Sequence, residues 1–223
     1  MSVLAQILRR LTFLRFPSIQ PDRQTGRMKQ IGILIFDGVE ELDAVGPWEV
    51  LAWWAINHPE DGYKVAFLSA DGNTVEAAKG LTLAPHYSAA DVPVLEIFLH
   101  PGGQGTRRLM RDEGHLEWVR SLAGRTALMT SVCTGALVYA AAGLLHDRPA
   151  TTHWGSLDLL KELDPTIDVR GEDRWVDNGD IITSAGVSAG IDMSLHLVRR
   201  LAGTERGRQV KRGIQYDPAP PID

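Results

Sequence analysis

The stretch TALMTSVCTGALVYAAAGLL (residues 126–145) contains the only cysteine of the chain, Cys133, between two segments of different pattern. The residues before Cys133 form a short apolar run, typical of a strand buried on both faces. The residues after it are rich in alanine and end at Gly143, as expected of a helix with a glycine stop. The stretch therefore predicts a strand, a sharp turn at Cys133 and a helix.

Strands and helices alternate on both sides of this stretch. Apolar runs predict buried strands at 29–38, 63–72 and 95–103, and helical patterns occur at 39–58, 112–123, 155–163 and 190–203. Pro47 is expected at the start of the first of these helices. Residues 74–88 and 167–186 are expected to form hairpins, the second turning at Asn178-Gly179. This order predicts an α/β layered fold, with a mostly parallel sheet and helices on both faces.

Composition excludes several classes of protein. The 223 residues carry a net charge of −5, which gives no footprint for nucleic-acid binding. One cysteine cannot form an intramolecular disulfide, and no apolar run is long enough to span a membrane. Residues 1–27 contain five arginines and a single acid. A targeting or membrane-surface helix is one interpretation of this stretch. We expect instead a disordered N-terminal extension, followed by a single domain over residues 28–223.

Three loops follow predicted strands of this sheet, so they are expected at one edge of it. Ligands of such folds bind at this edge, beyond the carboxyl ends of the strands. The three loops are the acidic turn at 40–43, the Pro-Gly-Gly turn at 101–103 and the turn at Cys133. A thiol at the start of a helix meets unpaired N–H groups and the positive end of the helix dipole, which favour a lowered cysteine pKa. Cys133 is therefore a candidate nucleophile, and the alternative is a buried, inert cysteine.

Candidate partners for this thiol lie in the other two loops. Gly102 and Gly103 permit close backbone approach, so the Gly103 N–H could face developing negative charge, although a plain turn is the alternative. Among Glu40, Glu41 and Asp43, the last is flanked by apolar residues and is expected to point inward, where burial would raise its pKa. The alternative is a solvated acidic loop.

His153 is a candidate base for Cys133, or a structural histidine. The other histidines show no metal-ligand spacing, so neither a metal nor a cofactor is expected. They are His58, His86, His100, His115, His146 and His196.

With these residues in view, the chain resembles the DJ-1/PfpI superfamily, and within it the isocyanide hydratase branch. The segments that carry the resemblance are residues 31–51, 100–110, 130–154, 179–198 and 216–221. The Cys-Thr-Gly at 133–135 is informative, because protease-like and deglycase-like branches tend to have Cys-His-Gly there. The resemblance implies a flavodoxin-like sandwich, related to class I glutamine amidotransferases, and usually a cytoplasmic homodimer.

The resemblance also implies roles for individual residues. Cys133 matches the nucleophile, and Asp43 matches the acid that hydrogen-bonds it and handles the proton. Thr134 matches a residue that orients the site and whose backbone N–H acts with that of Gly103. His153 matches a family position with no settled catalytic role.

The activity implied is addition of water to an isocyanide, a small electrophilic substrate, through a cysteine thioimidate. Two alternatives stay open. One is another enzyme of the superfamily, a glyoxalase, deglycase or amidotransferase-like hydrolase. The other is a redox-sensing or ligand-binding domain related to AraC-type regulators. The residues after the last predicted helix leave no room for a helix-turn-helix domain, so an intact transcription factor is not expected.

Overall fold

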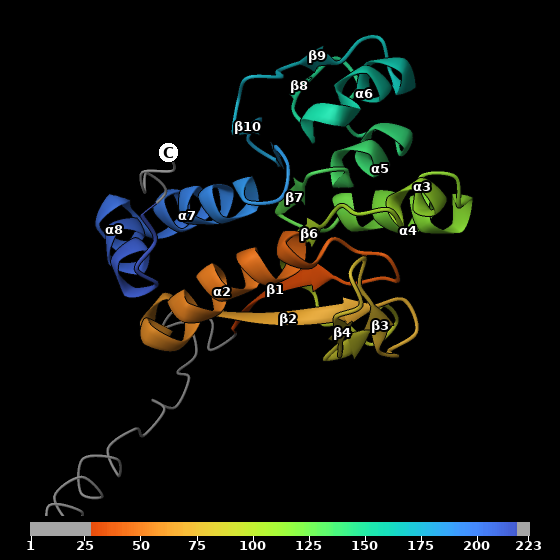
Figure 1. The fold of residues 1–223 in the computed structure, drawn as a ribbon. Helices are drawn as coiled ribbons and strands as arrows, with labels where there is room; N and C mark the ends of the chain where they lie inside the picture. Colours follow the sequence, from red (N-terminus) through yellow and green to blue (C-terminus); the bar gives the residue numbers. More distant parts are fainter. Residues whose placement is uncertain (1–27, 218–223) are drawn as a thin grey trace, which may run out of the picture.

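The computed structural model describes residues 28–217, and a seven-stranded sheet runs through its centre (Figure 1). The strands of this sheet are β1 (Lys29–Leu34), β2 (Tyr63–Ser69), β5 (Tyr87–Ser88), β6 (Leu95–His100), β7 (Leu128–Val132), β10 (Trp175–Asp177) and β11 (Ile181–Ser184). They lie in the order β10-β11-β7-β6-β1-β2-β5, and every neighbouring pair is parallel except β10 and β11. The predicted mostly parallel sheet is therefore confirmed.

Helices cover both faces of this sheet in two groups (Figure 1). The first group is α2 (Glu41–Asn57), α7 (Ala189–Ala202) and α8 (Thr204–Gly213), which contact one another. The second group is α3 (Thr106–Leu109), α4 (Glu113–Ala123), α5 (Gly135–Ala141) and α6 (Leu157–Leu163). Sheet and helices together form the flavodoxin-like three-layer sandwich that the family resemblance implied.

The central strands are buried on both faces, as their continuous apolar patterns indicate. Ile31 and Ile33 on β1 are fully buried, and their neighbour Leu34 is almost so. On β6, Phe98 and Leu99 are also fully buried. Removing each such side chain from water contributes about 1.5–3 kcal/mol. This rigid core fixes where the strands end, and so positions the loops that follow them.

The two expected hairpins are present. β3 (Val75–Glu76) and β4 (Thr82–Leu83) pair antiparallel, and so do β10 and β11, across a turn that contains Asn178 and Gly179. A parallel pair, β8 (Pro149–Ala150) and β9 (Asp168–Val169), was not predicted, because two-residue strands leave no recognisable pattern.

The expectation for Pro47 is wrong. The helix begins at Glu41, so Pro47 lies inside α2 rather than at its start. Glu41 and Asp43 in the first turn complement the positive end of the helix dipole, which favours the earlier start. The helix tolerates Pro47 at the loss of one hydrogen bond, the one its missing N–H would have donated to the Asp43 carbonyl. Asp43 is consequently a helix residue rather than a loop residue.

Helix α8 was also missed, because its ten residues bury only Val210 and show no apolar face. Arg206 fastens it instead, donating from Nε to Oδ2 of Asp61 at 2.7 Å and from Nη2 to Oδ1 at 3.1 Å. Within residues 28–217, no helix has the length and apolar composition needed to cross a membrane. The expected disordered extension, residues 1–27, lies outside the described part of the chain.

Candidate functional site

Cys133 occupies the turn between β7 and α5 with φ 57°, in the left-handed region. This conformation costs a non-glycine residue about 1–3 kcal/mol, so surrounding contacts must hold it. The Cys133 N–H donates to the carbonyls of Ser184 at 3.1 Å and Ala185 at 3.2 Å. Its own carbonyl accepts from Thr152 Oγ1 at 2.8 Å. The cysteine backbone is thus fastened from two sides, which fixes the direction of its side chain.

Asp43, in the first turn of α2, is the one of the three neighbouring acids that turns inward. Its side chain is 0% exposed, and its Oδ2 accepts a hydrogen bond of 2.9 Å from the Gly102 N–H. Its other oxygen, Oδ1, is buried and accepts no hydrogen bond from any residue of the described chain. Glu40 and Glu41 instead both pair with Lys79. One unpaired carboxylate oxygen is therefore left in the interior.

The Pro-Gly-Gly turn closes over this carboxyl group. The Gly102 carbonyl also accepts from the Glu40 N–H at 3.0 Å, so Gly102 both donates to and accepts from the start of α2. A Cβ at Gly102 would lie 2.5 Å from the Thr134 nitrogen and 2.8 Å from Asp43 Oδ2, closer than atoms approach. No side chain fits at this position while the turn keeps its place.

The expectation for the Gly103 N–H is wrong. This group does not face open space beside the sulfur, because it donates to Thr134 Oγ1 at 3.0 Å. Thr106 Oγ1 donates to the same hydroxyl oxygen, also at 3.0 Å. The Thr134 side chain therefore ties two loops together. Thr106 was not singled out in the sequence, although it follows the glycine turn closely.

Two other backbone N–H groups, those of Thr134 and Val187, donate to the Cys133 sulfur, and both act to lower the thiol pKa. Val187 has φ 48°, which is unusual for a β-branched residue. It lies in the turn between β11 and α7 and was missed in the sequence. The only signal was its position between Gly186 and Gly190, in a turn that follows a buried strand.

The expected low thiol pKa is also wrong. Burial and, to a smaller extent, the neighbouring Asp43 charge raise the pKa of Cys133 to about 12, although the two N–H groups act in the opposite direction. Burial likewise raises the pKa of Asp43 to about 7, despite the Gly102 N–H and the nearby thiol. The two side chains lie close enough to shift each other's pKa. Near neutral pH the site therefore holds a protonated thiol beside a carboxyl group that is half ionised.

His153 does not join this pair. Its Nδ1 accepts from the Gly155 N–H at 3.1 Å, at the start of the short 3-10 helix η2 (Trp154–Ser156). Its ring packs so closely on Gly186 that a Cβ there would lie 2.4 Å from Cδ2. These contacts give His153 a structural role, and it makes no hydrogen bond to Cys133 in the described chain.

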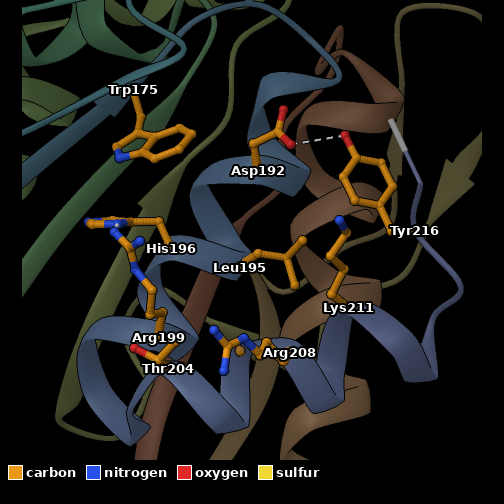
Figure 2. Close-up of a pocket in the computed structure, with 10 residues that line it drawn as sticks. Trp175, Asp192, Leu195, His196, Arg199, Thr204, Arg208, Lys211 and Tyr216 are labelled. Carbon is orange, nitrogen blue, oxygen red and sulfur yellow. Dashed lines mark hydrogen bonds between the residues drawn. The ribbon is translucent and has the colours of Figure 1, made fainter. Parts of the chain in front are cut away.

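A separate hollow of about 380 Å³ lies between β10, α7 and α8 (Figure 2). The Trp175 indole stacks on the His196 ring, and the Tyr216 hydroxyl donates to Asp192 at 3.0 Å. Its cationic side chains, among them Arg199 and Lys211, are exposed. None of the residues around Cys133 lines it, so it is not part of the thiol site.

Comparisons with known proteins agree with this architecture. The model of the DJ-1/PfpI family matches residues 29–200. The isonitrile hydratase of Pseudomonas putida is 42% identical over 194 residues, which are 87% of this chain and 81% of that protein. The HTH-type transcriptional regulator GbdR of Pseudomonas aeruginosa is 28% identical over 89% of this chain, but this match spans only 52% of the regulator. A crystal structure of a THiJ/PfpI family protein from Pseudomonas syringae has a TM-score of 0.80 and 29% identity, covering 93% of this chain and 86% of that one.

The raised pKa of Asp43 makes stability depend on pH. Between about pH 4 and pH 7 the folded protein keeps a proton on this group that the unfolded chain has lost. The stabilisation from this proton is complete below pH 4 and is lost as the pH rises through 7. Asp43→Asn removes this dependence. We expect the unfolding free energy of the variant, relative to wild type, to rise by about 2.5 kcal/mol from pH 5 to pH 8 in urea titrations.

Glu41→Gln is the matched control, because it makes the same chemical change two residues away. The pKa of Glu41 is lowered, so this group is ionised at both pH values and the difference should stay constant. A pH-independent difference for Asp43→Asn would contradict the raised pKa.

Gly102→Ala tests the close approach of the glycine turn. The added methyl group would collide with the Thr134 nitrogen and with Asp43 Oδ2, so we expect a loss of about 2–4 kcal/mol in unfolding free energy. Gly124→Ala is the control, because its Cβ would lie an ordinary 3.7 Å from the nearest atom. Equal stability of the two variants would show that the turn has room to move.

Proposed function

The chain belongs to the DJ-1/PfpI family, and on that premise we propose that it hydrates isocyanides, giving N-substituted formamides. The observation that carries the proposal is the buried pair of Asp43 and Cys133, in a chain 42% identical to an isonitrile hydratase. Neither group alone is specific. Together they would supply a sulfur nucleophile and, close to it, a proton carrier with a pKa of about 7.

The first step adds the thiol across the isocyanide carbon of R–N≡C. The Asp43 carboxylate takes the proton of the Cys133 thiol as the sulfur forms a bond to that carbon. The resulting carboxylic acid then returns the proton to the same carbon, giving the thioimidate Cys–S–CH=N–R. A free thiolate is not needed in the resting enzyme, so a thiol pKa near 12 is compatible with this step. The Thr134 and Val187 N–H groups stabilise negative charge on the sulfur during the attack.

The second step adds water to the thioimidate carbon. Asp43 accepts a proton from the attacking water and passes it to the thioimidate nitrogen, so that Asp43 is a carboxylate again. The tetrahedral product Cys–S–CH(OH)–NH–R then breaks its carbon–sulfur bond. The hydroxyl proton returns to the sulfur through Asp43, which leaves HC(=O)–NH–R and the original thiol. A carboxyl group whose pKa lies near neutral pH accepts and donates protons equally well, as both steps require.

The alternatives receive less support. A peroxide-sensing cysteine is usually exposed and has a low pKa, whereas Cys133 is 5% exposed with a raised pKa. The similarity to the transcriptional regulator GbdR would suit a regulatory role, but it is lower, at 28% identity. Thr134 also stands directly after the cysteine, where the deglycase-like branches usually have histidine.

Product analysis with simple alkyl and aryl isocyanides tests the activity. We expect wild-type protein to release formamide, and Cys133→Ala to lose at least about a thousand-fold in kcat/KM. Asp43→Asn should lose roughly a hundred-fold or more, because it cannot move a proton. Glu41→Gln, with the same change outside the pair, should keep wild-type activity. No formamide from any isocyanide would refute the proposed function.

The pH profile tests the mechanism separately. The carboxylate form of Asp43 accepts the thiol proton, so kcat/KM should rise with pH through an apparent pKa of about 7. The residual activity of Asp43→Asn should lack this rise. Formamide production by Cys133→Ala at the wild-type rate would leave the activity but exclude the covalent route.

We also propose that the protein acts as a cytoplasmic homodimer, as relatives of this fold usually do. Light scattering after size exclusion should give twice the chain mass of 24.5 kDa, independent of dilution through the micromolar range. A mass of one chain at all concentrations would exclude the dimer.

A further inference from the structure

The hollow between β10, α7 and α8 has the size of a small-molecule site (Figure 2). Its volume is about 380 Å³, and half-buried side chains with apolar surface line it, among them Trp175, Leu195 and Tyr216. The Trp175 ring is held in its orientation by stacking on His196, with ring centroids 5.3 Å apart. The hollow therefore offers fixed aromatic and apolar surface, and its charged groups decide which ligand it suits.

Three cationic side chains from two helices stand around this surface. Arg199 belongs to α7, whereas Arg208 and Lys211 belong to α8. All three are exposed, and Figure 2 shows them on different sides of Leu195. Cations gathered around one hollow repel one another, and an anion bound among them would relieve this repulsion.

Two of these cations have little compensation from acidic groups. The Lys211 ammonium makes no hydrogen bond and no ion pair with any of residues 28–217. Arg208 lies 3.6 Å from Glu205, and these two side chains are 73% and 72% exposed, so their ion pair contributes little. A bound anion would not have to displace a strong partner from either cation.

Arg199 is oriented by a histidine rather than by an acid. Its Nη2 donates to Nδ1 of His196 at 3.1 Å. Because an arginine can only donate, His196 accepts at Nδ1 and carries its proton on Nε2, which donates to Asp177 at 2.7 Å. The other N–H groups of the Arg199 guanidinium have no acceptor among the described residues. They are free to bind a ligand.

Asp192, the acidic residue of the lining, adds no free negative charge. Its Oδ2 accepts from Nε of Arg174 at 3.0 Å, and its Oδ1 accepts from the Tyr216 hydroxyl, also at 3.0 Å. Both carboxylate oxygens are therefore occupied, and the Arg174 charge balances that of Asp192. Arg174 itself does not line the hollow, so the three remaining cations leave it positively charged.

We propose that this hollow binds a small aromatic carboxylate. Its ring lies on the surface formed by Trp175 and Leu195, and its carboxylate lies among Arg199, Arg208 and Lys211. A guanidinium group can donate two parallel hydrogen bonds to a carboxylate, and an ammonium group adds a point charge. The proposal goes beyond the function proposed above and does not depend on it, because the hollow shares no residue with the thiol site.

Calorimetric titration of the full-length protein tests the proposal with four probes. Benzoate carries the ring and the negative charge, benzamide the ring without charge, acetate the charge without the ring, and benzylammonium the ring with the opposite charge. We expect benzoate to bind roughly tenfold more tightly than benzamide, with acetate and benzylammonium weaker than benzoate by at least as much. Any other probe binding as tightly as benzoate, or no binding of benzoate, would overturn the proposal.

Lys211→Met and Arg212→Met locate the negative charge of the ligand. Each removes one positive charge from neighbouring positions of α8, but only Lys211 lines the hollow. We expect Lys211→Met to weaken benzoate binding about three- to fivefold and to keep benzamide within about twofold of wild type. Arg212→Met should change neither affinity. Equal losses in the two variants would show a general effect of net charge and would overturn the site.

Trp175→Leu tests the aromatic surface separately from the charge. We expect it to weaken benzoate and benzamide by similar factors, about threefold or more, because both probes use the same ring contact. Trp154→Leu removes an indole that is 79% exposed and lies outside the hollow, so it should change neither affinity. Unchanged binding by Trp175→Leu would contradict the ring contact. Circular dichroism of each variant confirms that a lost affinity is not lost folding.

A crystal grown with benzoate gives the direct answer. The expected result is density for the ring against Trp175 and for the carboxylate beside Lys211. Benzoate bound at Cys133 instead, or a hollow filled by a second copy or by residues 218–223, would overturn the proposal. Cys133→Ala should bind benzoate as tightly as wild type does, which separates this site from the thiol.

Discussion

The buried carboxyl group of Asp43 is the constraint on which the rest of the site depends. A carboxyl group placed away from water needs hydrogen-bond donors, and the Gly102 N–H is one of them. Bringing that N–H within 2.9 Å requires the loop after β6 to lie against the first turn of α2. Thr134 then bonds the same loop to the cysteine turn. Three strand ends are thus drawn to one point around a single carboxyl group.

This arrangement costs stability, and the function proposed above would make use of it. Asp43 would be more easily ionised on the surface, where its pKa would be near 3.8, but there it would be a poor proton donor near neutral pH. The left-handed backbone at Cys133 and Val187 adds local strain at the same place. The largely buried strands β1, β6 and β7 supply the rigidity that keeps these unfavourable conformations in position.

The sequence was sufficient for features that depend on local pattern. Continuous apolar runs predicted the strands, and Cys133 between a strand and an alanine-rich segment predicted the turn. The choice of Asp43 over Glu40 and Glu41 as the inward acid followed from its apolar neighbours. Features set by long-range contact were not predictable. The partner of the Gly103 N–H depends on where Thr134 lies, and the thiol pKa depends on burial that no short segment specifies.

Hydrogen bonds join the His115 ring, the His100 ring and the Pro101 carbonyl, and they connect His115 to the loop beside Asp43. The Pro101 carbonyl can only accept, so His100 donates to it from Nδ1 and accepts at Nε2 from Nε2 of His115. The Pro101 carbonyl and the Gly102 N–H on which Asp43 depends belong to the same peptide group. The backbone of the loop that bonds Asp43 therefore determines which nitrogen of the His115 ring carries the proton, and it leaves Nδ1 as the acceptor. If this carbonyl turned away, the proton on each of the two imidazole rings could move to the other ring nitrogen. His115 would then donate from Nδ1, where it now accepts.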